Sequence, residues 1–193
     1  MSVSKTNNRR IAKNTLLLYV RMMFTMLVSI YTSRVILDVL GIDDYGLYQT
    51  VGGIVGFLAF INGALSAGSS RFITFALGEN NENKLKETFS TTFLIHLALA
   101  FVVVILAETI GSWFLYYKLQ IAQERMDAAV YVFHLSVITA FLNLVQTPFS
   151  AVIIAREKMA IYAYVSIFEV SLKLLIVYLL LLGNFDKLVL YAT

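Results

Sequence analysis

The segment most informative about the fold is AAVYVFHLSVITAFLNLVQTPFSAVIIA, residues 128–155. It lies between Asp127 and Arg156 and contains no formally charged residue. As a helix it is long enough to cross the roughly 30 Å hydrocarbon core of a bilayer, which takes about 20 residues. The run does not alternate apolar and polar residues, as a membrane β-strand would. It therefore predicts a membrane-spanning helix.

Four further apolar runs show the same pattern, three before this segment and one after it. Two of them are almost free of charge, and the first and last contain charged residues within the run. Because lipid offers the backbone no hydrogen-bond partners, a helix is the expected form for each run. The sequence predicts an all-α, polytopic transmembrane helical bundle with five complete spans, at about 14–38, 45–71, 88–112, 128–155 and 159–183, and a sixth that begins at about 188.

Composition supports a single membrane domain and excludes several other classes. Of 193 residues, 59% are hydrophobic and 14% are charged, where a soluble domain carries about 25% charged residues. No stretch accommodates a nucleotide-binding domain, and no Gly-rich phosphate loop is present. With no Cys and only two His, the chain offers no thiolate site and a poor metal site. We expect no enzymatic activity, no cofactor, no metal and no nucleic-acid partner.

Basic residues orient the bundle. With the N-terminus in the cytoplasm, nine basic residues fall on the inner side and three on the outer side, which agrees with the positive-inside rule. A cleaved signal peptide is the alternative for the first apolar run, but Arg21 interrupts it, and we favour a retained helix. The inner residues are Lys5, Arg9, Arg10, Lys13, Arg71, Lys84, Lys86, Arg156 and Lys158, and the outer ones are Lys118, Arg125 and Lys187.

Polar residues inside the first span form a narrow stripe. Arg21 and Thr25 share one helical face with Asn14, Ser29 and Thr32. Ionisable residues at membrane depth are costly and mark functional positions by default. Arg21 either faces a cavity inside the bundle or extends along the helix to the inner headgroups.

The fifth span carries an acid and a base four residues apart. Glu169 and Lys173 stand in the order that favours an ion pair on a helix. The pair either neutralises itself for insertion or presents Lys173 to a central cavity, with Glu169 as a proton carrier. Arg21 and Lys173 together would suit a phosphate or diphosphate group, since both side chains keep their charge unless strongly desolvated.

Two other spans carry distinct patterns. In the fourth span, Asn143 and Gln146 belong to a polar face, and Pro148 predicts either a static kink or a hinge. Small residues fill the second span, with Gly52 and Gly56 at a spacing that permits close helix contact. The two histidines, in different spans, are expected to form hydrogen bonds between helices.

Several segments together resemble one family. Four segments follow one another in the order and spacing that this family shows. They are RIAKNTLLLY (10–19), YTSRVILDVLGIDDYGLY (31–48), VGGIVG with FINGALS and RF (51–72), and TPFSAVIIAREKM followed by YAY (147–164). The chain resembles the N-terminal portion of Wzx-type oligosaccharide flippases of the multidrug/oligosaccharidyl-lipid/polysaccharide (MOP) exporter superfamily. The motifs are soft individually, and their order carries the likeness.

The resemblance implies a MATE-like fold with two pseudo-symmetric lobes around a central cavity. It implies transport of an undecaprenyl-diphosphate-linked oligosaccharide for O-antigen or other polysaccharide export, across the bacterial cytoplasmic (inner) membrane. Implied partners are the bilayer, this lipid-linked glycan, a glycan polymerase and export machinery. Cavity candidates, by position, are Arg21, Thr25, Asn143, Gln146, Glu169 and Lys173. The length matches only the N-terminal lobe, so we expect a truncated reading frame, a fragment or a chain completed by a partner.

Two alternatives stay open. A multidrug or cation antiporter would share the fold, and midplane acids would favour it, whereas the surplus of Arg21 and Lys173 over Glu169 favours an anionic substrate. A membrane glycan polymerase or assembly subunit is the other alternative. Asp43 and Asp44, the adjacent acidic pair, suit a turn between helices better than acid–base catalysis.

Overall fold

The computed structural model describes residues 2–58, 60–182 and 187–192. These residues form helices and short connections, without a strand in the described part of the chain. In chain order the helices are α1 (Ser2–Leu58), α2 (Phe60–Gly78), α3 (Glu82–Leu106), α4 (Ser112–Tyr117), α5 (Met126–Ala155), α6 (Met159–Leu182) and α7 (Lys187–Ala192). A π-helical turn (Ala107–Gly111) joins α3 to α4, and a 3-10 turn (Gln123–Arg125) precedes α5.

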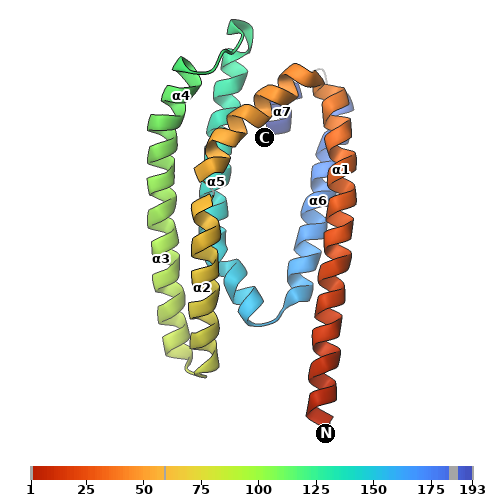
Figure 1. Cartoon of the computed structure of the whole chain (residues 1–193), viewed down its shortest axis with the longest axis vertical. Coiled ribbons are helices and arrows are strands. Elements are labelled where there is room, and N and C mark those ends of the chain that lie inside the picture. Colours follow the sequence, from red (N-terminus) through yellow and green to blue (C-terminus); the bar gives the residue numbers. More distant parts are fainter. Residues whose placement is uncertain (1, 59, 183–186, 193) are drawn as a thin grey trace.

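Helix α1 consists of two legs that meet at Gly41. This residue has φ 80° and ψ 172°, a backbone conformation that is essentially restricted to glycine. The first leg runs the length of the molecule, and the second leg turns away and crosses toward α5 (Figure 1). A single glycine thus redirects the chain from one part of the bundle to the other.

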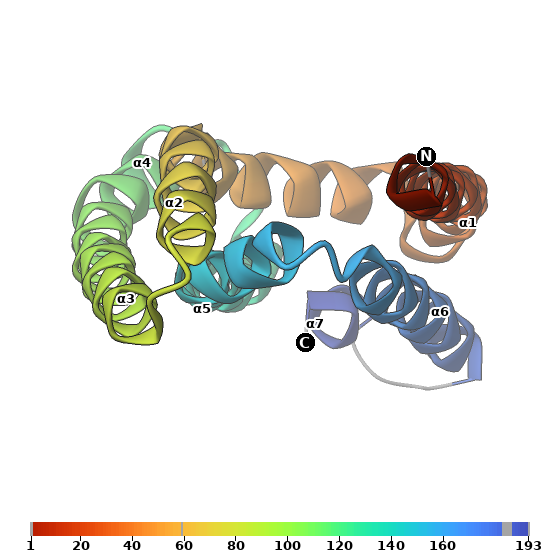
Figure 2. The same ribbon diagram turned by 90° about the horizontal axis from the view of Figure 1, so that it is seen from below.

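The helices form two groups. Helices α2, α3 and α5 pack against one another, and the first leg of α1 packs against α6. Seen along the long axis, the second leg of α1 bridges the groups at one end and the α5–α6 connection bridges them at the other (Figure 2). The first leg of α1 and α6 run parallel, since both ascend from the end that holds the N-terminus.

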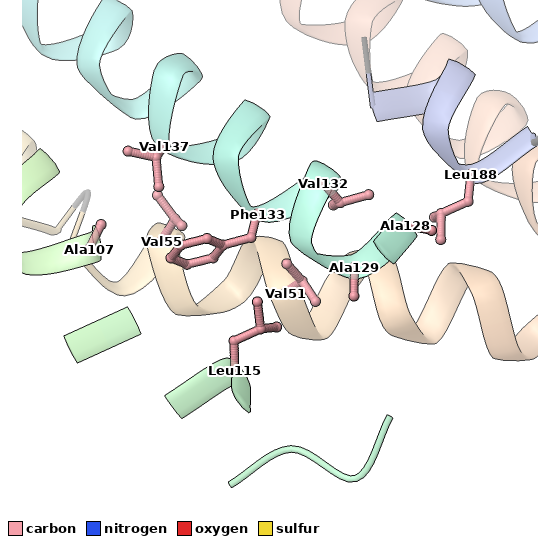
Figure 3. Close-up of a cluster of buried hydrophobic side chains, with 10 residues drawn as sticks. All are labelled: Val51, Val55, Ala107, Leu115, Ala128, Ala129, Val132, Phe133, Val137 and Leu188. Atoms are coloured by element: carbon pink, nitrogen blue, oxygen red, sulfur yellow. The ribbon is translucent and has the colours of Figure 1, made fainter. Parts of the chain in front are cut away.

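The largest buried cluster lies where the second leg of α1 crosses α5. Phe133 of α5 is fully buried and packs near Val51 and Val55 of α1 (Figure 3). Gly111 of the π-helical turn sits directly on the same ring, because a Cβ there would lie 2.9 Å from Phe133 Cζ. The remaining members are Ala107, Leu115, Ala128, Ala129, Val132, Val137 and Leu188. This cluster fixes the end of the described bundle that lies away from the N-terminus.

The observed helices confirm the predicted all-α class and refine its spans. Among the described residues, four helical stretches are long and apolar enough to cross a membrane: Ile11–Phe57, Glu82–Tyr117, Gln123–Ala155 and Met159–Leu179. The predicted second span, 45–71, covers the second leg of α1 and the first part of α2, apart from residue 59, which lies outside the described residues. The predicted sixth start coincides with α7, and the predicted end of the fifth span at 183 lies outside the described residues.

The polar turn between α2 and α3 begins a helix by a local mechanism. Asn81 has extended backbone angles, and its side chain accepts hydrogen bonds from the backbone N–H groups of Asn83 and Lys84. An asparagine in this position satisfies donors that the first helical turn leaves unpaired. Lys84 also pairs with Glu79 at 2.6 Å. The turn leading into a helix, expected from this polar stretch, is therefore present.

Candidate functional site

The first element of the site is the seam between α1 and α6. Near one end, the Asn14 side-chain amide donates to the Glu157 backbone carbonyl at 3.4 Å. Near the other, the hydroxyls of Tyr31 and Tyr178 are 2.7 Å apart. Polar contacts at both ends fix the register of the two parallel helices. Asn14, the first residue of the predicted stripe, therefore lies on the side of α1 that faces the start of α6.

Arg21 lies within this seam. Its guanidinium carbon is 4.2 Å from the centroid of the Tyr162 ring on α6, a cation–π geometry. The Arg21 Nε atom is buried and has no hydrogen-bond partner. Among the described residues the ion pairs join other groups, so Arg21 has no carboxylate partner there. The structure therefore places the positive charge of Arg21 against an aromatic face.

Thr25 shares the face of Arg21 one turn further along α1. Its side chain is half-buried, and its hydroxyl donates to the Met22 backbone carbonyl at 3.0 Å. The hydroxyl is thus engaged within its own helix. Thr32, further up the stripe, has a buried hydroxyl oxygen without a partner. The stripe is polar along its length, but its members are not joined to one another.

Glu169 and Lys173 form the predicted ion pair on α6. Lys173 Nζ is 3.0 Å from Glu169 Oε1, and the two side chains are 66% and 60% exposed. Lys173 follows Tyr162 by eleven residues, so it lies about 16 Å further along the helix than the Arg21 contact, at about 1.5 Å per residue. One phosphate group cannot touch both cations. Arg21 and Lys173 therefore lie at two different levels along α6, here called the two cationic levels.

A polar groove lies between the second leg of α1 and α5. It has a volume of about 290 Å³ and is lined by Tyr48, Gln49, Gly52, Val55, Gly56, Ser136, Thr139, Ala140 and Asn143. The lining offers hydroxyl, amide and aromatic groups without a formal charge.

The glycines of the second predicted span open this groove. The sequence predicts that Gly52 and Gly56 permit close helix packing. In the structure, a Cβ at Gly52 would lie 3.9 Å from Ser136 Oγ, and one at Gly56 would meet nothing within 4 Å. The missing side chains therefore leave space on the α5 side of α1. Of the two predicted α5 residues, Asn143 lines the groove and Gln146 is exposed outside it.

A sequence model of the family described as MatE matches residues 11–179. The chain belongs to the MatE family. No curated protein and no solved structure gives a significant match.

MatE membership agrees with the observed helices. MatE proteins are membrane transporters of the MATE/MOP superfamily and not enzymes. The long apolar helices of this MatE chain identify it as a multi-pass membrane protein. The groove and the two cationic levels therefore belong to a chain of a transporter family.

Both histidines of the MatE chain serve as links between helices, as predicted. His96 is buried, with Nε2 3.4 Å from Ser69 Oγ on α2 and Nδ1 2.9 Å from the Thr92 carbonyl. His134 Nδ1 is 3.0 Å from Glu108 Oε1. Across the residues that the structure describes, no three metal-binding side chains gather in one place.

Three site residues escaped prediction from the sequence. Tyr48 and Gln49 line the groove, and Tyr162 receives Arg21. Nothing in one sequence pairs Tyr162 with Arg21, a residue 141 positions earlier. Tyr48 and Gln49 directly precede the small-residue stretch, and this neighbourhood is the signal that could have found them.

Proposed function

We propose that this MatE chain contributes to a flippase for undecaprenyl-diphosphate-linked oligosaccharides, as the N-terminal portion of a larger transporter in the bacterial cytoplasmic membrane. The observation that carries the proposal is Arg21, a cation among apolar helices with no carboxylate partner in the described structure. A cation inside a membrane with no carboxylate beside it favours an anionic ligand over a cationic one. A diphosphate is an anion of this kind.

The two cationic levels support stepwise movement of such a headgroup. Arg21 lies toward the N-terminal end of the molecule, and Lys173 lies further along α6. A diphosphate released from Arg21 would next approach Lys173, whose pairing with Glu169 is exposed and easily exchanged. The neutral groove beside Tyr48 offers hydroxyl and amide groups suited to sugar hydroxyls.

The alternative is a multidrug or cation antiporter of the same fold. The observation that favours it is Glu169, whose exposed carboxylate could accept a cationic drug or a proton in place of Lys173. The two proposals predict opposite sensitivities. A diphosphate flippase depends on Arg21 and Lys173, whereas a cation antiporter depends on Glu169.

The test is complementation of glycan export, with Arg21→Ala and Lys173→Ala placed in the gene that encodes this chain. Each is expected to lower export at least about tenfold, because one charge-assisted contact is worth about 1.5–3 kcal/mol. Lys13→Ala is the matched control, since it removes an exposed cation at the start of the first span. Variants are compared at equal membrane abundance.

The outcomes separate the two functions. Normal export with both Arg21→Ala and Lys173→Ala would reject the anion site. Loss of efflux of a cationic dye in Glu169→Gln, with export unaffected by any variant, would establish the antiporter instead. A glycan polymerase or assembly subunit would gain support if neither transport activity responded.

A further inference from the structure

A second surface, remote from the groove, combines apolar and cationic features. At the end that holds the N-terminus, α3 and α5 form an apolar groove of about 390 Å³. Its lining is Leu85, Lys86, Phe89, Phe149, Val152, Ile153 and Arg156. Both helix ends appear at the near side of the molecule in Figure 2. The volume falls within the range of small-molecule sites.

Aromatic rings build the wall of this groove. The Phe149 ring meets Phe89 and Phe93 edge to face, with centroids 5.3 and 5.8 Å apart. Such contacts hold the rings in place. Phe149 is nevertheless 51% exposed. The wall is therefore preformed and open to an apolar ligand from the side.

A smaller polar hollow adjoins the apolar groove. It measures about 190 Å³ and is lined by Ala76, Leu77, Asn80, Asn81, Glu82, Leu85 and Arg156. Leu85 and Arg156 line both hollows, so the two hollows lie next to each other at these residues. The boundary between the two hollows, here called the junction, is thus formed by one apolar side chain, Leu85, and one cationic side chain, Arg156.

The charges at this junction are mainly positive and unpaired. Lys86 and Arg156 are both exposed, and in the described part of the chain neither forms an ion pair. Glu82 is the carboxylate in the polar hollow, and it lies in the first turn of α3, where the helix dipole offsets its charge. Lys84 is already paired with Glu79.

We propose that this surface binds an anionic phospholipid. One acyl chain lies in the groove against Phe89 and Phe149, and the phosphate lies between Lys86 and Arg156, with its headgroup in the hollow of Asn80 and Asn81. The amphipathic shape and the two unpaired cations match a lipid phosphate more closely than an uncharged ligand. With the N-terminus in the cytoplasm, the lipid comes from the inner leaflet.

The test is native mass spectrometry of the full chain in mild detergent. The probes are phosphatidylglycerol, phosphatidylcholine with the same acyl chains, and inorganic phosphate. Phosphatidylglycerol is expected to bind at least about tenfold more tightly than phosphatidylcholine. Millimolar inorganic phosphate should not displace it, because phosphate lacks the chain that fills the groove.

Two sets of variants locate the site. The double variant Lys86→Gln/Arg156→Gln is expected to weaken phosphatidylglycerol binding about 25-fold, from about fivefold for each charge removed. The double variant Lys13→Gln/Arg71→Gln changes the net charge equally outside the groove and should bind within about twofold of the unchanged chain. Val152→Trp fills the groove and should weaken binding while Lys86 and Arg156 remain.

Three results would overturn the proposal. Equal binding of the two phospholipids would remove the anionic requirement. Equal binding by the two double variants would place the lipid elsewhere. Displacement of phosphatidylglycerol by inorganic phosphate would show that the surface binds a phosphate group alone and not the acyl chain. Thermal unfolding of each variant establishes that it is folded, and Val152→Trp gives an independent result if a charge variant is not.

Discussion

At the scale of single residues, Arg21 and Tyr162 define the most specific contact of the candidate site. The ring stands 4.2 Å from the guanidinium carbon and fixes its direction. A desolvated cation–π contact is worth about 2 kcal/mol. The aromatic face, and not the phenolic hydroxyl, supplies this attraction, so Tyr162 is a positioning residue for Arg21.

This contact gives the first prediction. Tyr162→Ala should lower glycan export by about tenfold or somewhat more, and Tyr162→Phe should leave it within about twofold, because phenylalanine preserves the ring. Export is measured by complementation at matched membrane abundance. If Tyr162→Phe failed as completely as Tyr162→Ala, the hydroxyl and not the ring would be the functional group.

The residue scale also shows what one sequence can and cannot provide. Helical periodicity places Arg21 and Thr25 on one face, and the i,i+4 spacing predicts the pair of Glu169 with Lys173, which the structure contains. Both are local properties of one helix. The partner of Arg21 depends on the register between α1 and α6, and that register arises from packing between distant segments.

At the scale of elements, the break in α1 controls where the second leg runs. Gly41 has a φ of 80° and a ψ of 172°, which a residue with a Cβ adopts only with strain. The surroundings of the Cβ position are open, so the cost is in the backbone and not in a clash.

Substitution at this position gives the second prediction. Gly41→Ala should destabilise the chain by about 1–3 kcal/mol, measured as a lower thermal unfolding midpoint in lipid nanodiscs. Gly46→Ala is the matched control, because Gly46 also meets nothing within 4 Å and its φ is not positive. An equal loss in both variants would show that the helix direction does not depend on Gly41.

The direction of the chain at a bend is the part of the fold that hydropathy does not provide. The apolar runs predict helices over 88–112 and 128–155, where the structure has the helical stretches Glu82–Tyr117 and Gln123–Ala155. The runs predicted at 14–38 and 45–71 leave a gap that contains Gly41, the residue at which α1 bends. Hydropathy records which residues prefer lipid and carries no information about the direction that the backbone takes at this glycine.

At the scale of the whole molecule, the groove lies beside the segment that bridges the two helix groups. It lies between the second leg of α1 and α5, and Gly52 faces Ser136 across it. Because the chain contains no cysteine, a pair of introduced cysteines would form the sole thiols. This property makes the arrangement directly testable.

The third prediction is a cross-link. Gly52→Cys/Ser136→Cys should oxidise readily to an intramolecular disulfide, because the Cβ position of Gly52 is 3.9 Å from Ser136 Oγ. Electrophoretic mobility with and without reductant reports the bond. Gly53→Cys/Ser136→Cys is the control and should stay reduced, since Gly53 meets nothing within 4 Å. Equal oxidation of both pairs would contradict the described α1–α5 crossing.

The pairing of α1 with α6 has a consequence for biosynthesis. The bonded residues along this seam are 143 and 147 positions apart in the chain. At a synthesis rate of roughly 5–20 residues per second, about 7–30 s pass between the emergence of the two partners. During that interval Arg21 lies in the membrane without its contact to the Tyr162 ring. The nascent first helix must therefore be sheltered by lipid headgroups, by the insertion machinery or by a chaperone until translation supplies α6.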